Sequence, residues 1–301
     1  MGGGSPCFAD SSGKLLFYIS PSEKDPNNSL NVINRDYEIV EGAPIKGYMF
    51  AQEVMALPFT TVQNRFHVFS IYYSKYPPDY LSYLYYHVLD MNANGGKGKL
   101  LQKDSILLDP NPGYLHGLFA IKHANGKDWW LMGHKRGSAT FFRFLLKDDR
   151  FTGPEYQTIG NDRWNDPRRA AAGWMYTDAS SNGDKVAVVQ SHGIAELYDF
   201  DRTSGLLANP VYFGWKELVT WKEDYIITDF MSGISFSSDD QQLYVLTRDS
   251  VLQLYIHAND IISSKRLIHV HDTMPDSRYH NFTMRRGPDG KIYGGVPECM
   301  L

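Results

Sequence analysis

The chain lacks a surplus of either charge and lacks any long apolar run, and each absence argues against a class of partner. Its 301 residues carry a net charge of -4, so there is no overall positive field of the kind that nucleic-acid binding usually requires. No apolar run approaches the roughly 18 to 20 residues that a membrane-spanning helix needs. The composition therefore predicts no nucleic-acid partner and no insertion into a membrane.

Cysteine is also scarce. Only Cys7 and Cys299 are present, near opposite ends of the chain, and no C-x-x-C pair of the kind found in zinc sites occurs. In a secreted, ring-shaped fold the two ends meet, so Cys7 and Cys299 are candidates for a disulfide across the closing seam. Two unrelated thiols are the alternative.

Linear active-site signatures are missing too. The sequence has no G-x-S-x-G elbow, no phosphate-binding loop, no H-E-x-x-H pair and no dinucleotide fingerprint. No catalytic residue can therefore be named, and a binding function is favoured over an enzymatic one. An enzyme stays open, because dispersed His, Asp, Glu and Arg residues can form an active site without any linear motif.

The sequence does contain a repeat. A polar turn followed by a short run of apolar, aromatic or β-branched residues occurs six times. The runs begin 51, 63, 57, 57 and 49 residues apart, at Leu15, Phe66, Trp129, Val186, Leu243 and Ile292. Known propeller repeats are about 40 to 50 residues long, so these steps fit blades with longer loops. Asn-Gly and Asp-Gly turns supply the positive φ of tight hairpins, so each copy predicts strands A and B of a blade.

The better-preserved copies predict a second hairpin. Tyr198 lies 12 residues after Val186, and Tyr255 lies 12 residues after Leu243, which indicates one plan of four antiparallel strands. We therefore predict an all-β chain, a β-propeller with six blade signals, in which a complete ring holds seven blades, or six. Trp129 and Trp130, which begin the third run, point to opposite faces of a strand and are expected to pack between blades.

The ends of the chain predict an incomplete ring. The first copy lacks most of strand A, and the last copy stops after strand B. We expect residues 6–301 to form a single propeller domain that is truncated at both ends. Residues 1–5 have neither the basic nor the apolar region of a signal peptide and are interpreted as an artificial linker or a cut end.

Six segments of the repeat carry a family resemblance. They are Phe8–Tyr18, Ile33–Glu38, Val88–Gly98, Lys122–His134, Glu196–Asp201 and Pro288–Tyr293. They resemble the N-terminal propeller of large secreted surface proteins of gliding-type Bacteroidetes, which often carry PKD-like domains and a C-terminal sorting domain. The resemblance implies a secreted or cell-surface module and transfers no catalytic residue. The signal peptide and the sorting domain of a complete member are not in this chain.

The propeller plan predicts where a ligand would bind. The D–A and B–C loops share one face of a propeller, around the central funnel. Trp can stack on sugar rings and Arg can bind carboxylates through two hydrogen bonds, so we expect a glycan, a small acidic ligand or a protein on this face. Ordinary polar loops are the alternative. The candidate ligand-binding residues are His116, His134, Arg136, Arg163, Trp164, Asp166, Arg168, His192, Trp221, Arg248 and His280.

No cofactor is predicted, although a divalent metal is an open alternative. His134 and His192 follow strand B in neighbouring copies, and with Asp166 they could ligate a metal ion. The alternative function is accordingly a funnel-centred hydrolase or lyase, with or without a metal, that uses some of His134, His192, Asp166, Arg168 and Arg248. The oligomeric state and the identity of the ligand stay open.

Overall fold

The computed structural model describes most of the chain. The described residues are 6–10, 12–25, 28–49, 52–74, 81–109, 115–135, 137–161, 175–190, 194–213, 231–247, 250–270 and 283–295. They are almost entirely β-strands, and the one helical segment among them is the short 3-10 turn η1 (Asn94–Gly96). The prediction of an all-β chain is confirmed.

The strands form five four-stranded sheets and one two-stranded sheet. The first comprises β1 (Cys7–Ala9), β2 (Leu15–Pro21), β3 (Ser29–Asn34) and β4 (Ile45–Lys46). The second comprises β5 (Val54–Pro58), β6 (Arg65–Tyr73), β7 (Ser82–Asp90) and β8 (Lys99–Leu108). The third comprises β9 (Leu115–Lys122), β10 (Trp129–Lys135), β11 (Thr140–Lys147) and β12 (Arg150–Thr158).

The remaining sheets continue the same plan. The fourth comprises β13 (Met175–Ala179), β14 (Lys185–Gln190), β15 (Ile194–Asp201) and β16 (Leu206–Tyr212). The fifth comprises β17 (Met231–Phe236), β18 (Gln242–Thr247), β19 (Ser250–Tyr255) and β20 (Arg266–Val270). The sixth contains β21 (Thr283–Arg286) and β22 (Ile292–Gly295). Every neighbouring pair is antiparallel and sequential, which is the up-and-down order of propeller blades.

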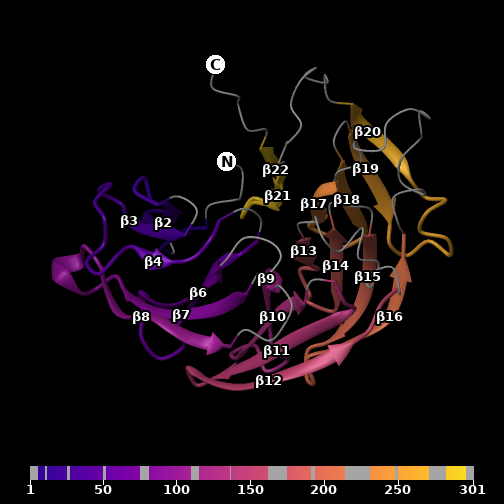
Figure 1. Ribbon diagram of the computed structural model, residues 1–301. Helices are drawn as coiled ribbons and strands as arrows, with labels where there is room; N and C mark the ends of the chain where they lie inside the picture. The colour runs from indigo at the N-terminus through magenta and orange to yellow at the C-terminus, as the bar shows by residue number, and fades with distance from the viewer. Residues whose placement is uncertain are drawn as a thin grey trace.

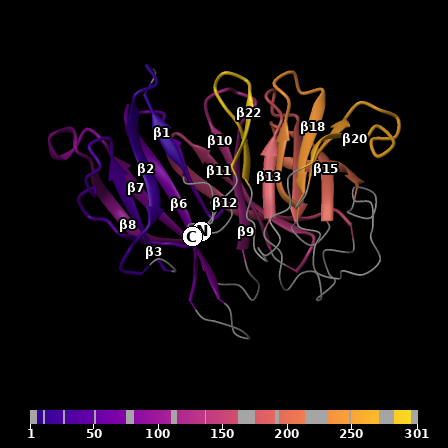
Figure 2. The same cartoon turned by 90° about the horizontal axis from the view of Figure 1, so that it is seen from above.

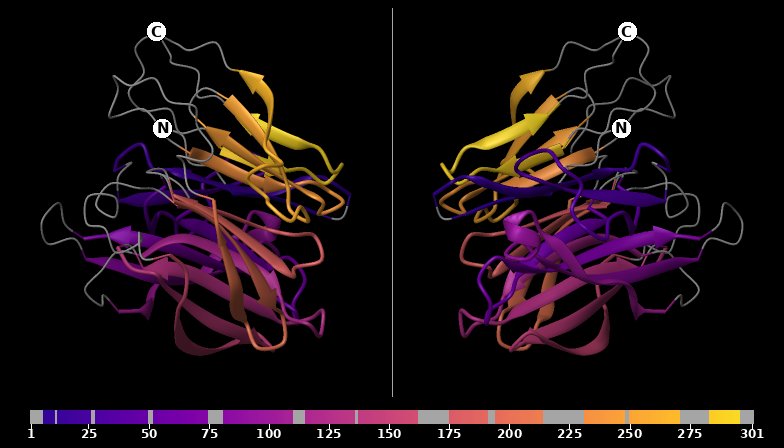
Figure 3. Two further views of the ribbon diagram at one scale, coloured as in Figure 1. Left: turned by 90° about the vertical axis from the view of Figure 1, so that its right-hand side faces the viewer. Right: turned by 90° about the vertical axis from the view of Figure 1, so that its left-hand side faces the viewer.

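The sheets are arranged as blades around a centre. Figure 1 shows an arc from the first sheet, in indigo, through the magenta strands to the orange fifth sheet, with the short sixth sheet between the two arms. Figure 2 and Figure 3 show the sheets side by side from two other directions. The prediction of a β-propeller is confirmed. The number of blades in a complete ring stays a prediction.

The predicted starts of strand B agree with the observed ones. Leu15, Trp129 and Ile292 are the first residues of β2, β10 and β22. The strands β6, β14 and β18 begin one residue before the positions predicted for them. This accuracy has a local cause, since a turn with positive φ followed by an apolar run defines a hairpin without help from distant residues.

The apolar core lies between neighbouring blades. Phe17 of the first sheet and Phe66 of the second are in edge contact, with ring centroids 4.9 Å apart. The same arrangement joins Phe141 and Tyr198 of the third and fourth sheets, at 5.6 Å. Trp130 is buried in this second contact, as predicted for packing between blades, and its indole N–H donates to the carbonyl of Arg202. Side chains from neighbouring blades therefore share common apolar clusters.

Turns at one end of the strands connect neighbouring blades. The carboxylate of Asp149, in the β11–β12 turn, accepts hydrogen bonds from the backbone of Thr60 and Thr61 in the β5–β6 turn and contacts His67 Nε2 at 3.1 Å. The carboxylate of Asp240 accepts hydrogen bonds from two backbone N–H groups of the β13–β14 turn. These contacts orient the blades relative to one another.

Candidate functional site

A cavity of about 1340 Å³ lies at the centre of the blades. Its wall is built largely from the innermost strands β1, β5, β9, β13 and β21 and from the turns that follow them. The cavity is lined by aromatic residues that include Phe8 and Trp129, and by the polar residues Thr177 and Asp178 of β13. Ligand pockets of drug-sized molecules measure about 300 to 1,000 Å³, so this cavity is large enough for a small ligand.

The charged side chains of the cavity are mostly basic. The basic residues are Lys122, Arg202, Arg285 and Arg286, and the acidic residues are Asp10 and Asp178. This local excess of positive charge contrasts with the net charge of -4 for the whole chain. Because a cavity walled by protein concentrates the field of its charges, it favours anionic ligands.

Gln52 forms hydrogen bonds with two other blades at the wall of the cavity. It precedes β5, and its side-chain amide bonds the backbone of Thr177 in β13 twice, with Nε2 donating to the carbonyl at 2.9 Å and Oε1 accepting from the N–H at 2.9 Å. The backbone carbonyl of Gln52 also accepts from the N–H of Leu118 in β9 at 2.7 Å. One residue thus connects the second, third and fourth blades.

Arg285 is the most exposed of the described arginines in the wall. Its side chain projects from β21 into the cavity, where Nη1 lies 3.4 Å from the carbonyl oxygen of Thr177. Arg285 as a whole residue is exposed and lines the cavity, yet the surrounding strands reduce the hydration of its guanidinium. This partial burial lowers the pKa of Arg285, and the nearby Asp178 and Tyr176 oppose the shift. Arg285 keeps its positive charge, since arginine titrates far above neutral pH.

Asp178 forms its hydrogen bonds with the fifth blade and not with Arg285. Its Oδ2 accepts hydrogen bonds from the N–H of Phe236 at 2.9 Å and from Ser235 Oγ at 3.1 Å. Burial raises the pKa of Asp178, and these hydrogen bonds and the charge of Arg285 limit the rise. The carboxylate therefore holds β17 in place and compensates Arg285 only at a distance.

Arg202 and Arg286, the other two arginines of the cavity wall, form hydrogen bonds with neighbouring turns and strands. Arg202 donates to the carbonyls of Lys122, His123 and Asn182, which belong to two blades. Arg286 donates to Ser181 Oγ and to the carbonyl of Ser237. Their donors are therefore engaged by protein acceptors, in contrast to those of Arg285.

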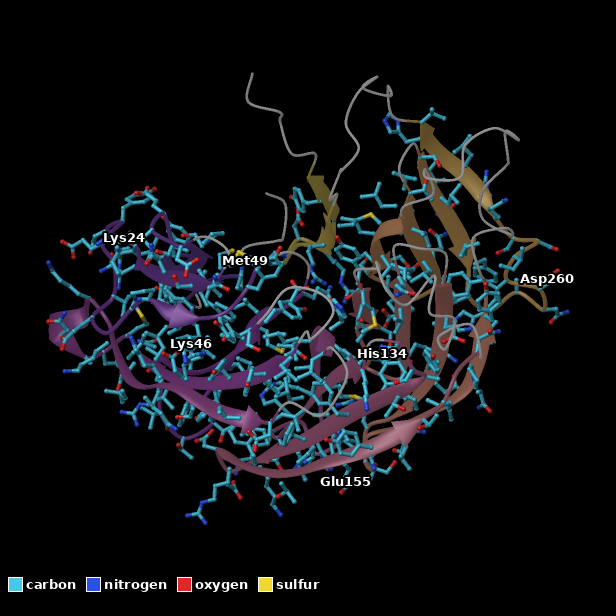
Figure 4. The ribbon with its side chains drawn as sticks, viewed as in Figure 1. Lys24, Lys46, Met49, His134, Glu155 and Asp260 are labelled. Atoms are coloured by element: carbon cyan, nitrogen blue, oxygen red, sulfur yellow. The ribbon has the colours of Figure 1, made fainter. Side chains whose placement is uncertain are left out.

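His116 and His134 are adjacent, but they are not loop residues as expected. They pair across β9 and β10, and both are buried. The expectation was wrong because the strands extend further toward this face than the apolar runs indicated. Burial, with a smaller contribution from His116, lowers the pKa of His134 to about 3, so its ring is neutral. Figure 4 places His134 toward the inside of the molecule and Glu155 at its outer edge.

Two further side chains belong to this buried group. Glu53 is fully buried, and its Oε1 lies 3.8 Å from His116 Nδ1. The hydroxyl of Tyr176 has no hydrogen-bond partner among the described residues, and burial raises its pKa. No group of three potential metal ligands occurs in the part of the chain that the structure describes. The metal site stays a prediction, since His192 and Asp166 lie outside that part.

Most of the other predicted residues also lie outside the described residues. They are Arg136, Arg163, Trp164, Arg168, Trp221, Arg248, His280 and Cys299. Cys7 is exposed, and its pairing with Cys299 stays a prediction.

A Ser–His–Asp arrangement in the second blade is not a catalytic triad. Ser70 Oγ lies 2.9 Å from His87 Nε2, but the backbone N–H of Asp104 donates to His87 Nδ1 at 2.9 Å. Nε2 must therefore carry the ring proton, and Ser70 donates its own proton to the carbonyl of Lys46 at 2.6 Å. A general base needs the opposite arrangement, with Nε2 free to accept the serine proton. Ser70 and His87 are also fully buried.

Sequence reasoning missed Gln52, Asp178 and Arg285, because it looked for the site in loops. A signal was available: the innermost strand of each blade lines the centre of a propeller, and Asp178 and Arg285 come shortly before the polar turns that mark the repeat. Charged residues at the end of strand A are therefore candidates for the wall of the cavity.

Comparison with known proteins supports the fold. The chain matches no protein-family model and no curated protein. A solved structure from Bacteroides uniformis, provisionally described as a 6-phosphogluconolactonase, is 14% identical with a TM-score of 0.54, covering 96% of this chain and 76% of that one. The WD40 domain of SCAP from fission yeast is 11% identical with a TM-score of 0.44, over 89% of this chain and 52% of that one.

A third similar structure is the extracellular domain of a protein from B. thetaiotaomicron provisionally described as a one-component system. It is 10% identical with a TM-score of 0.48, covering 96% of this chain and 31% of that one. At such low identity, a likeness concerns the fold and says nothing about function. Among the described residues, no helix has the length and apolar character needed to cross a membrane.

Proposed function

We propose that this chain is a binding module of a secreted or cell-surface protein, and that its ligand, a glycan or a segment of a protein, occupies the central cavity. The observation that carries the proposal is the cavity itself, which combines a volume of about 1340 Å³ with aromatic and charged side chains in its wall. Ligand sites are typically concave, with a mainly apolar lining and a few polar groups that orient the ligand.

The chemistry of the described wall supports binding more than catalysis. Arginine and lysine can orient a ligand, and Phe8 and Trp129 offer apolar ring surface. The Ser70–His87–Asp104 arrangement cannot act as a catalytic triad, because His87 Nε2 carries the ring proton and cannot accept one from Ser70. The alternative of a funnel-centred hydrolase or lyase stays a prediction, because His134 is its single described residue.

The proposed location rests on the resemblance of the blade motifs to the propellers of secreted surface proteins of gliding-type Bacteroidetes. A glycan or a protein ligand would suit a surface module. The resemblance does not identify the ligand.

A cavity-filling variant tests the proposal. Ala9 is exposed in β1 and lines the cavity, whereas Ala208 is exposed on the outer strand β16. Ala9→Trp should abolish the binding that the purified wild-type chain shows on a glycan array or to surface-protein peptides, and Ala208→Trp should leave it unchanged. If no glycan or peptide binds, or if both variants bind as well as the wild type does, the proposal is wrong.

A further inference from the structure

Arg285 differs from the other arginines of the cavity in what its guanidinium contacts. Arg286 Nη1 lies 3.6 Å from Asp240 Oδ1 and donates to two further oxygens. Arg202 donates to three carbonyl oxygens. Arg285 makes a single hydrogen bond with the described residues, and that bond is long, at 3.4 Å.

The one acceptor of Arg285 is already engaged. The carbonyl of Thr177 accepts a hydrogen bond of 2.9 Å from Gln52 Nε2, so Arg285 Nη1 is a second and more distant donor to the same oxygen. A guanidinium has five N–H donors in a planar fork. The remaining donors of Arg285 are therefore available to a ligand in the cavity.

The neighbouring acid does not neutralise this charge by contact. The charge of Asp178 acts on Arg285, but no described carboxylate forms an ion pair with Arg285. Oδ2 of Asp178 accepts hydrogen bonds from the fifth blade instead. An unpaired cation walled by protein is costly unless an anion accompanies it. Because Arg285 stays accessible from the cavity, that anion can come from solution.

We propose that the central cavity binds an acidic saccharide, and that Arg285 holds its carboxylate. The proposal rests on the proposed binding function and names the class of ligand. The planar fork of arginine matches the two oxygens of a carboxylate, which can accept two parallel hydrogen bonds. Lys122 adds a second positive charge to the wall, beside the ring of Trp129, with Nζ 5.2 Å from the ring centroid. The rings of Trp129 and Phe8 provide flat apolar surface for the sugar.

Calorimetric titration with trigalacturonic acid tests the proposal, with the fully methyl-esterified trimer as the uncharged comparison. The wild-type chain should bind the acid saturably and bind the ester at least about ten-fold more weakly, because a charged hydrogen bond contributes that much or more. Binding should weaken as salt concentration rises, since salt screens the attraction. Equal affinity for acid and ester, or no binding of the acid, would overturn the proposal.

Variants assign the effect to Arg285. Arg285→Gln should weaken binding of the acid at least about ten-fold, and Arg285→Lys should retain part of it. Arg150→Gln makes the same charge change on the outer strand β12, where Arg150 is exposed, and should have no effect. Thermal unfolding of each variant checks the fold. If Arg285→Gln binds the acid as the wild type does, the proposal fails.

The outcomes separate this proposal from the proposed function. Binding of the acid and the ester with equal affinity, blocked by Ala9→Trp, would leave the central cavity as a binding site and reject the role of Arg285. Binding that survives Ala9→Trp would reject the cavity as well.

Discussion

The side-chain amide of Gln52 pairs with the backbone of Thr177 through two hydrogen bonds of 2.9 Å, across 125 residues of sequence. Gln52 precedes the second blade and Thr177 lies in the fourth, so the contact spans the third blade. The amide bonds the N–H and the carbonyl of Thr177 as a neighbouring β-strand would, because it offers one donor and one acceptor to the same residue. It links blades that are not neighbours in the chain.

Replacing Gln52 should therefore destabilise the whole ring. In Gln52→Leu, the buried N–H and carbonyl of Thr177 lose their short hydrogen bonds, which we expect to lower the free energy of unfolding by about 2 to 4 kcal/mol. Chemical denaturation measures the change. Gln102→Leu is the control, because Gln102 is exposed on β8 and bonds only Ser105. Equal stability of the two variants would contradict the structural role of Gln52.

Asp149 should matter far more than its neighbour Asp148. Asp149 accepts hydrogen bonds from Thr60, Thr61 and His67 of the second blade, whereas Asp148 forms an exposed ion pair with Lys127. We expect Asp149→Ala to lower the free energy of unfolding by about 2 to 3 kcal/mol. Asp148→Ala should have a much smaller effect, because solvent screens its ion pair with Lys127. Both residues have positive φ, so the backbone cost of alanine is similar in the two variants, and urea denaturation reads the difference.

Two glycines separate backbone strain from steric clash. Gly205 has φ of +70°, and a Cβ atom there would lie 2.7 Å from ring atoms of Trp130. Gly126 has φ of +71° and no atom within 4 Å of such a Cβ. Gly126→Ala should cost about 1 kcal/mol from backbone strain, and Gly205→Ala about 1 to 3 kcal/mol more because Trp130 must move. If the two variants have the same melting temperature, Trp130 does not pack against the turn at Gly205 as closely as the structure shows.

Acid should destabilise the fold through buried histidines. Burial lowers the pKa of His87 and of His134 from 6.5 to about 3. Below pH 6.5 the unfolded chain binds protons that the folded chain does not, so stability is complete above this pH and is lost as the pH falls toward 3. Each ring contributes up to about 1.4 kcal/mol per pH unit.

Urea denaturation at several pH values between 7 and 4 measures this loss. His87→Gln should reduce the slope of the free energy of unfolding against pH by the contribution of one ring, up to about 1.4 kcal/mol per pH unit. His257→Gln, at an exposed position, should leave it unchanged. A pH dependence that is the same in His87→Gln and in the wild type would show that the ring of His87 is not held neutral by the fold.

The candidate site could be predicted only in part. The sequence placed His116 and His134 among the candidates of one face of the propeller, but as loop residues, whereas the structure pairs them across β9 and β10 of the third blade. Glu53 and Tyr176, which join them, come from two other blades. No periodicity relates these four residues, so only the ring geometry brings them together.

The sequence by itself determined the strand plan. A turn with positive φ and the apolar run after it are local features, so the starts of β2, β6, β10, β14, β18 and β22 were predicted to within one residue. The tertiary structure decided which side chains line the centre and which of them stay available. Nothing in the sequence distinguishes Arg202, Arg285 and Arg286 as ligand-binding residues. In the structure, neighbouring blades offer several hydrogen-bond acceptors to Arg202 and Arg286, but the described residues offer only one, distant acceptor to Arg285. The long-range packing of blades therefore leaves Arg285 open to a ligand.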